Sequence, residues 1–101
     1  MTHSNVTRDV ESFGSLKAEV LELDISALDR AGEEDNVAPT HLNRVRGSSV
    51  HFATGSNQNG EYVGSYNETR GGLAVHNVSS GSAAPNNAAL NTTRVTWWGE
   101  R

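Results

Sequence analysis

The clearest strand pattern in the chain is Leu16-Lys-Ala-Glu-Val-Leu-Glu-Leu-Asp-Ile-Ser26. Its apolar residues Leu21, Leu23 and Ile25 recur at every second position, with acidic residues between them. Side chains on a β-strand alternate between the two faces of the sheet, so this pattern buries one face and leaves the other in water. The sequence therefore predicts a half-buried strand over Lys17–Ile25.

Four further short stretches have the composition and alternation of strands. They are Ser48–Thr54, Glu61–Tyr66, Leu73–Val78 and Thr92–Trp98. Segments rich in Gly and Asn separate them, as expected for turns and hairpin loops. Only Pro39–Asn43 has the composition of a helical turn. The sequence predicts an all-β fold, a small β-sandwich or partly open barrel of about five or more short strands.

The remaining segments are predicted as an arm and loops. Met1–Phe13 is polar and aperiodic, which predicts an extended N-terminal arm that is disordered alone and docks on a neighbouring subunit. Residues 14–101 form one domain, because 101 residues support a single core. The acidic Asp29–Asn36 and the low-complexity Ser79–Leu90 are expected to be loops, the second of them mobile.

Composition argues against several classes of function. The chain has no cysteine, which excludes disulfides, thiolate metal ligands and cysteine nucleophiles. A net charge of -4 disfavours non-specific nucleic-acid binding, which requires a basic face. No apolar run reaches membrane-spanning length, and the N-terminus lacks the pattern of a signal peptide. There is no Gly-x-Ser-x-Gly elbow and no phosphate-binding loop, so we expect neither an enzyme nor a bound cofactor.

Several acidic residues are possible ligands of a cation. Asp24, Asp29 and Glu33–Asp35 offer carboxylate oxygens of the kind that Ca²⁺ prefers. Their spacing matches no calcium-binding loop, however, and Arg30 lies among them. The histidines are scattered without zinc-ligand spacing. We therefore predict a solvated loop and no metal site.

The candidate interface residues are apolar side chains without an obvious place in the core. Val6, Val10 and Phe13 are possible anchors on the predicted arm. Tyr62 lies on a predicted strand with few charges to protect its edge from pairing. In the last strand, Val95 and Trp97 share the core face and Trp98 points the other way, where either a partner protein or a stacked ligand is a possible contact.

A series of segments carries a resemblance to a known family. The segments are Ser12-Phe-Gly-Ser15, the strand that begins at Lys17, the Gly32-Glu33 loop, Thr40-His-Leu42, Gly60-Glu-Tyr-Val63 and Thr92-Thr-Arg-Val-Thr96. Together they resemble the small structural head proteins of tailed viruses, known as capsid decoration or cement proteins. Where the family tends to read Ser-Tyr-Pro-Thr-Gly-Gly-Glu, this chain has Leu28-Asp-Arg-Ala-Gly-Glu33, which keeps Gly-Glu without Tyr-Pro.

The resemblance implies a function and its partners. It implies a virion structural protein on the capsid surface that stabilises the shell, with the major capsid protein as its partner. Neither nucleic acid nor membrane is expected to be a direct partner. We expect a homotrimer at a threefold position of the lattice. The alternatives are a tail or head-tail connector component, and a carbohydrate- or cell-surface-binding β-module.

Overall fold

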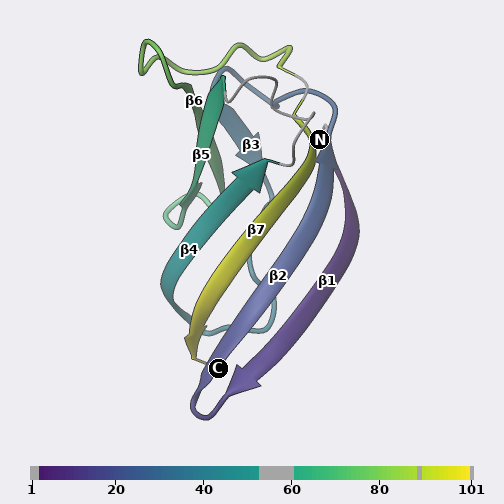
Figure 1. Cartoon of the computed structure of the whole chain (residues 1–101), viewed down its shortest axis with the longest axis vertical. Coiled ribbons are helices and arrows are strands. Elements are labelled where there is room, and N and C mark those ends of the chain that lie inside the picture. Colours follow the sequence, from purple (N-terminus) through teal and green to yellow (C-terminus); the bar gives the residue numbers. More distant parts are fainter. Residues whose placement is uncertain (1–2, 53–60, 89, 101) are drawn as a thin grey trace.

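The computed structural model describes residues 3–52, 61–88 and 90–100 of the chain. The regular structure in these ranges is all-β, in two antiparallel sheets (Figure 1). The strands are β1 (His3–Phe13), β2 (Leu16–Ile25), β3 (Glu33–Asp35), β4 (Arg44–Phe52), β5 (Tyr62–Asn67), β6 (Gly72–Asn77) and β7 (Asn91–Glu100). The sheets do not close into a barrel, so the predicted small β-sandwich is confirmed.

The two sheets differ in size. The larger sheet has the order β1-β2-β7-β4, and the smaller has the order β3-β6-β5. The smaller sheet lies behind the upper part of the larger one in Figure 1. The chain between β3 and β4 runs behind the lower part. The inner face of the larger sheet is therefore covered by strands at one end and by a connecting segment at the other.

The alternation read from β2 and β7 is confirmed. Leu21, Leu23 and Ile25 are fully buried, as are Val95 and Trp97. Leu21 lies directly opposite Val95 in the antiparallel register, so the two strands contribute to the same inner face. In β4, Val50 and Phe52 also pack against this core. The strand begins at Arg44 rather than at the predicted Ser48, and its predicted end at Thr54 lies outside the described residues.

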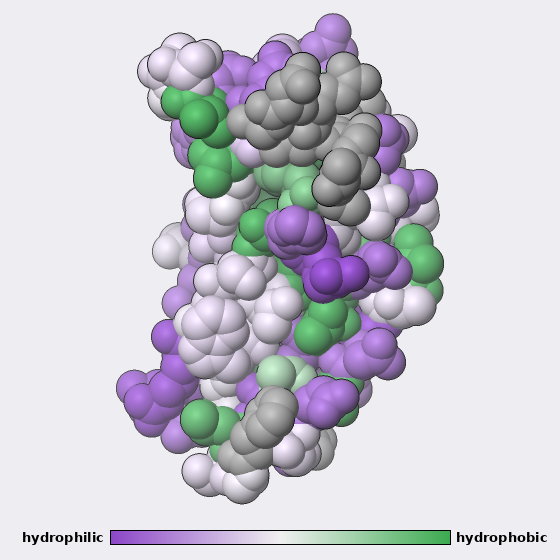
Figure 2. Space-filling view, viewed as in Figure 1, coloured by the Kyte–Doolittle hydropathy of each residue, from purple (hydrophilic) through white to green (hydrophobic). Residues whose placement is uncertain are grey.

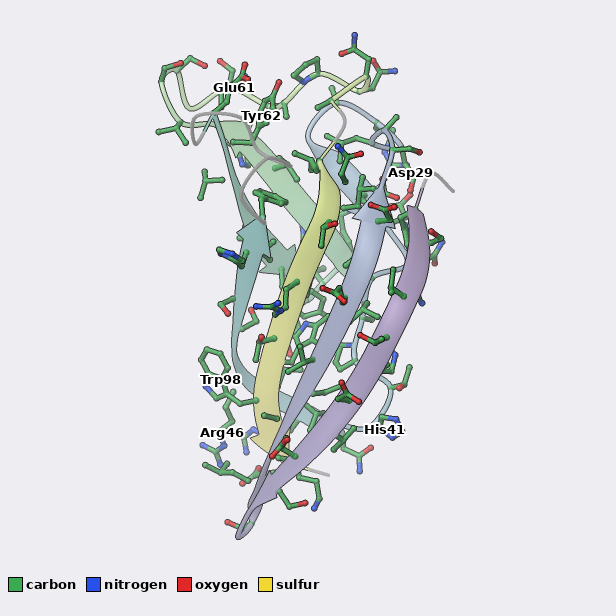
Figure 3. The ribbon with its side chains drawn as sticks, turned by 45° about the vertical axis from the view of Figure 1, so that its right-hand side comes forward. Asp29, His41, Arg46, Glu61, Tyr62 and Trp98 are labelled. Atoms are coloured by element: carbon green, nitrogen blue, oxygen red, sulfur yellow. The ribbon has the colours of Figure 1, made fainter. Side chains whose placement is uncertain are left out.

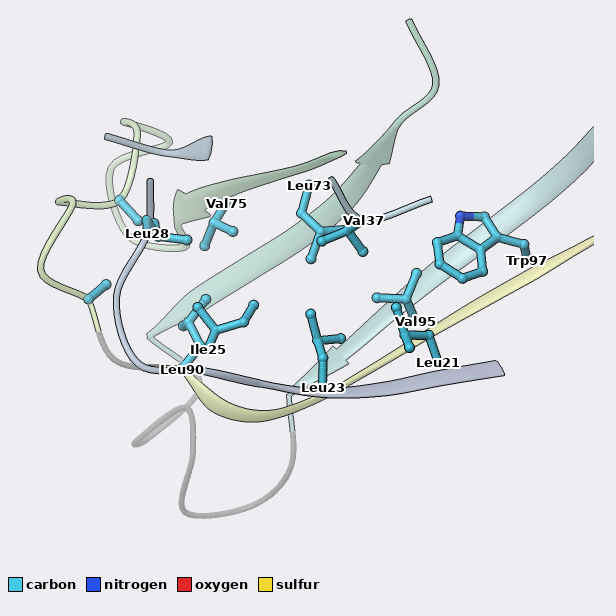
Figure 4. Close-up of a cluster of buried hydrophobic side chains, with 12 residues drawn as sticks. Leu21, Leu23, Ile25, Leu28, Val37, Leu73, Val75, Leu90, Val95 and Trp97 are labelled. Carbon is cyan, nitrogen blue, oxygen red and sulfur yellow. The ribbon is translucent and has the colours of Figure 1, made fainter. Parts of the chain in front are cut away.

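The core is formed between the sheets and includes residues from the loops (Figure 4). It contains Leu21, Leu23, Ile25, Leu28, Val37, Leu73, Val75, Ala84, Ala88, Leu90, Val95 and Trp97. Trp97 is its largest fully buried side chain. The ring of Tyr66 meets the Trp97 ring edge to face, with centroids 5.5 Å apart and planes at 83°.

The prediction of a free arm is wrong for the described part of Met1–Phe13. This segment is β1, paired antiparallel with β2 from His3 to Phe13 along the edge of the larger sheet. A bulge between Asn5 and Thr7 leaves Val6 outside the register. The inward positions of β1 include polar residues such as His3 and Arg8, and for this reason no hydrophobic period marked the segment as a strand.

Three loop predictions also need correction. Pro39–Asn43 forms bends rather than a helical turn. Within Asp29–Asn36, Glu33–Asp35 is the short strand β3, which pairs with β6. The described residues of Ser79–Leu90 form no regular strand, as expected, but they bury Ala84 and Leu90 in the core. One of the Gly- and Asn-rich segments expected to be turns, Gly55–Gly60, lies outside the described residues.

The first prediction separates the two adjacent tryptophans. Trp97→Ala should lower the free energy of unfolding by about 3–5 kcal/mol, because it leaves a cavity between the sheets. Such a loss is a large part of the stability of a domain this small. Trp98→Ala removes a side chain that is 42% exposed and should cost far less. Thermal unfolding followed by circular dichroism measures the melting temperature of both variants. An equal decrease in the two would contradict the assignment of Trp97 to the inner face and Trp98 to the outer face.

Candidate interaction surface

Buried titratable groups are the usual sign of chemistry, and two carboxylates are fully buried here. They are Glu19 in β2 and Glu34 in β3. A buried carboxylate must be neutralised or hydrogen-bonded, because the interior solvates charge poorly. The donors around each group decide whether it is free to react or is held in place.

Glu19 is held by donors from two other parts of the chain. Arg8 of β1 donates to its Oε2. The backbone N–H of Thr40 donates to Oε2 at 2.9 Å, and that of His41 donates to Oε1 at 2.8 Å. The Thr40 hydroxyl adds a contact of 3.2 Å to Oε2. Both carboxylate oxygens therefore have partners, and the group connects β1, β2 and the chain between β3 and β4.

The pKa of Glu19 reflects this environment. Burial alone would raise the pKa, because it penalises the charged form. The N–H groups of Thr40 and His41 and the guanidinium of Arg8 favour the carboxylate more strongly. The net pKa therefore lies below the ordinary value for glutamate. A group that stays ionised and fully bonded is a structural anchor rather than a general acid or base.

Glu34 has a similar arrangement in the smaller sheet. Its Oε2 lies 2.5 Å from Nδ1 of His3, and both side chains are almost completely buried. Its Oε1 accepts the backbone N–H of Asp29 at 2.9 Å. Glu34 thus joins β3 to the start of β1, across the two sheets. The expectation that this acidic run is simply solvated is wrong at Glu34.

The other acidic side chains of this region form surface ion pairs. Arg30 binds Asp35 through two contacts, of 2.6 and 2.8 Å, and Glu33 at 3.1 Å. Arg70 adds a contact of 3.1 Å to Glu33. The hydrogen bond and charge of Arg30 hold the pKa of Asp35 below its usual value. Among the described residues, no group of three or more His, Asp or Glu is placed to hold a metal ion.

Trp98 is the most distinctive side chain on the outer face of the larger sheet. Its ring lies against the backbone of Gly47 in β4, since a Cβ added there would be 2.4 to 2.5 Å from three indole atoms. On β2 its cross-strand neighbour is Ala18. Small neighbours on both sides leave the indole 42% exposed. The sequence predicted this outward position, and the structure adds the flat glycine support beneath the ring.

The other predicted interface residues are scattered over the molecule. Val6 and Val10 are 61% and 40% exposed on the edge strand β1, which Phe13 ends. Tyr62 is half-buried on β5 of the smaller sheet. Figure 3 shows Tyr62 at the opposite end of the molecule from Trp98 and Arg46. The structure therefore offers two separate surfaces, the outer face with Trp98 and the β1 edge.

The outer face also has a charge pattern that the sequence reading missed. Glu22 of β2 and Arg94 of β7 are directly opposite each other and point outward, because their neighbours along each strand are buried. Within the described part of the chain, neither makes an ion pair. Figure 2, drawn from this side, shows hydrophilic and near-neutral atoms with separate hydrophobic patches. Only the strand order shows which of these charges are neighbours.

Comparisons with protein-family models, with curated proteins and with solved structures found no match to this chain. The described residues contain no helix long and apolar enough to cross a membrane.

The second prediction concerns Glu19 and pH. Its pKa is lowered on folding, so its stabilising contribution is complete above the ordinary glutamate pKa and is lost as the pH falls through the folded value. Glu19→Gln should destabilise the protein by about 2–4 kcal/mol at pH 7, because it removes the partner of Arg8. The difference between wild type and variant should shrink on acidification.

Denaturant titrations at pH 7, 5 and 3 measure this difference. Glu68→Gln is the matched control, since it makes the same chemical change in the exposed β5–β6 turn and should alter stability little. If the loss in free energy of unfolding caused by Glu19→Gln does not decrease at low pH, the lowered pKa of Glu19 is contradicted.

Proposed function

We propose that this protein is a virion structural protein that decorates and stabilises the capsid shell of a tailed virus, without catalysis. The resemblance of its segments to capsid decoration proteins supports this. Of these segments, Ser12–Ser15 spans the end of β1 and the β1–β2 turn at Gly14 and Ser15, and Thr92–Thr96 lies in β7. The capsid surface is the proposed location, and the major capsid protein is the proposed partner.

The observation that carries the proposal is the exposed edge of the larger sheet. β1 is 11 residues long and, among the strands of the described residues, pairs with β2 alone. Such an edge presents backbone donors and acceptors that a strand from another protein can join. Val6 and Val10 add exposed apolar surface along it. A shell protein that supplies an extended segment would continue the sheet beyond β1.

The edge is also rigidly held. Arg8 binds the buried carboxylate of Glu19, and His3 binds that of Glu34. These contacts fix β1 to both sheets before any partner arrives. A preorganised surface loses little conformational entropy on binding, which favours a stable contact with a shell. Since these contacts belong to the fold, deleting residues 1–12 should destabilise the domain.

Self-association on the particle is part of the proposal. β5 is an edge of the smaller sheet, with Val63 54% exposed and Tyr62 beside it. Three copies joined through this edge would form a closed ring at a threefold lattice position. The surface acids Glu33 and Asp35 are already paired with Arg30 and Arg70, so they offer little free charge to a basic patch of the shell.

A second candidate function has one specific observation in its favour. The exposed Trp98 ring, supported by Gly47, has the form of an aromatic platform on which a sugar ring can stack. A carbohydrate-binding module is therefore the alternative to shell decoration. Mass spectrometry of purified particles distinguishes the two, because decoration requires many copies per particle.

The third prediction tests the β1 edge. The double variant Val6→Lys/Val10→Lys should fold, because both side chains are exposed, and should bind particles that lack this protein at least tenfold more weakly. Lysine on an edge strand disfavours pairing with another strand. Val78→Lys is the control, since Val78 is 60% exposed in a turn away from this edge.

Co-sedimentation of purified protein with particles measures the binding. Unchanged binding by the double variant would contradict the role of β1. Absence of the wild-type chain from particles, together with no binding, would contradict decoration itself.

A further inference from the structure

The outer face of the larger sheet is divided by charge. β1 and β2 contribute only acidic charged side chains to it: Asp9, Glu11, Glu22 and Asp24. β4 and β7 contribute the exposed side chains of Arg44, Arg46 and Arg94. Glu100 is the acidic exception on this half, and it is paired with Arg46 at 3.0 Å. One half of the face is thus acidic, and the other half is basic.

The strand register places these charges in rows across the sheet. One row runs through Thr7, Glu22 and Arg94, and a row nearer the β1–β2 turn runs through Glu11, Ala18 and Trp98. Arg46 belongs to the irregular step of β4 beside the second row, because the register shifts between Val45 and Gly47. Trp98 and Ala18 therefore occupy the middle strands, with an acid at one side and Arg46 at the other.

We propose that this face binds a second copy of the same chain across a two-fold axis that runs along the strands. Such an axis lays the β1–β2 half of one copy on the β7–β4 half of the other. It places Glu22 opposite the second copy's Arg94, which makes the main charge contact. It also places Glu11 near the second copy's Arg46, which remains paired with Glu100. A two-fold axis across the strands would instead place acid on acid, so the charge pattern selects the first arrangement.

The side chains at the centre fit the same arrangement. Trp98 of each copy faces the Ala18 position of the other, so a large indole meets a small side chain twice. Aligned face-to-face packing is the usual way in which two twisted sheets bury their faces. Glu22 and Arg94, which make no ion pair within the described part of one copy, gain partners in the pair.

The size of the face sets the expected strength. Four strands about 4.8 Å apart and about ten residues long, at about 3.3 Å per residue, cover roughly 600 Å² per copy. This is below the roughly 800 Å² per partner of a standard stable interface. The pair should therefore be weak and reversible, with a micromolar dissociation constant, and it should weaken further in salt. This inference does not rest on the proposed function, since shell docking uses the β1 edge.

The test is sedimentation equilibrium of the full chain at low and high ionic strength. Wild type should show a monomer–dimer equilibrium that shifts toward monomer in salt. Glu22→Arg and Arg94→Glu should each weaken dimerisation at least tenfold, because each places like charges opposite one another. Trp98→Ala should weaken it as well. Glu68→Arg makes the same charge change in the exposed β5–β6 turn and should leave dimerisation unchanged.

Mixing supplies the decisive measurement. An equimolar mixture of Glu22→Arg and Arg94→Glu should form a one-to-one heterodimer, and the double variant Glu22→Arg/Arg94→Glu should again form a homodimer. Circular dichroism of each variant checks that it is folded. Dimerisation regained by the mixture and by the double variant cannot come from a general gain or loss of stability.

Three results would overturn the proposal. The first is a wild-type chain that stays monomeric at low salt and millimolar concentration. The second is a pair of single variants that dimerise as wild type does, or whose mixture forms no heterodimer. The third is quenching of Trp98 fluorescence by cellohexaose while the chain remains monomeric, which would assign the face to a carbohydrate.

Discussion

The fold depends on hydrogen-bond donors for two buried carboxylates, Glu19 and Glu34. Glu19 lies on the inner face of β2 in line with Leu21 and Leu23, where a charge is tolerated only if donors surround it. The donors come from Arg8 and from the backbone of Thr40 and His41. This requirement explains why the chain between β3 and β4 covers the end of the larger sheet that the smaller sheet does not reach.

The sequence predicted those strands in which apolar residues on the buried face alternate with polar residues on the exposed face. β2 and β7 alternate strongly, and both their position and their buried sides were correct. β1 was missed because its inward residues His3 and Arg8 are polar, and their partners are carboxylates from other strands. The burial of Glu34 was missed for the same reason, since nothing in the neighbouring sequence distinguishes one buried acid from the exposed acids beside it.

The candidate interface was predictable only residue by residue. The outward direction of Trp98 follows from its place beside Trp97 in a strand, and the sequence was sufficient for it. The division of the outer face into an acidic and a basic half was not predictable in this way. It depends on β7 lying between β2 and β4, an order that joins the last strand to two strands far earlier in the chain.

Charges inside and outside this sandwich therefore have different consequences. The inner carboxylates find all their donors within one copy, and they stiffen the edge strand that they hold. Glu22 and Arg94 are cross-strand neighbours that face water. An ion pair in such a place contributes only about 0–1 kcal/mol to stability, so a single copy gains little by forming one between them. Their attraction becomes significant when a second surface excludes the water between them. The same chemistry that completes the fold on one face leaves the opposite face suited to association.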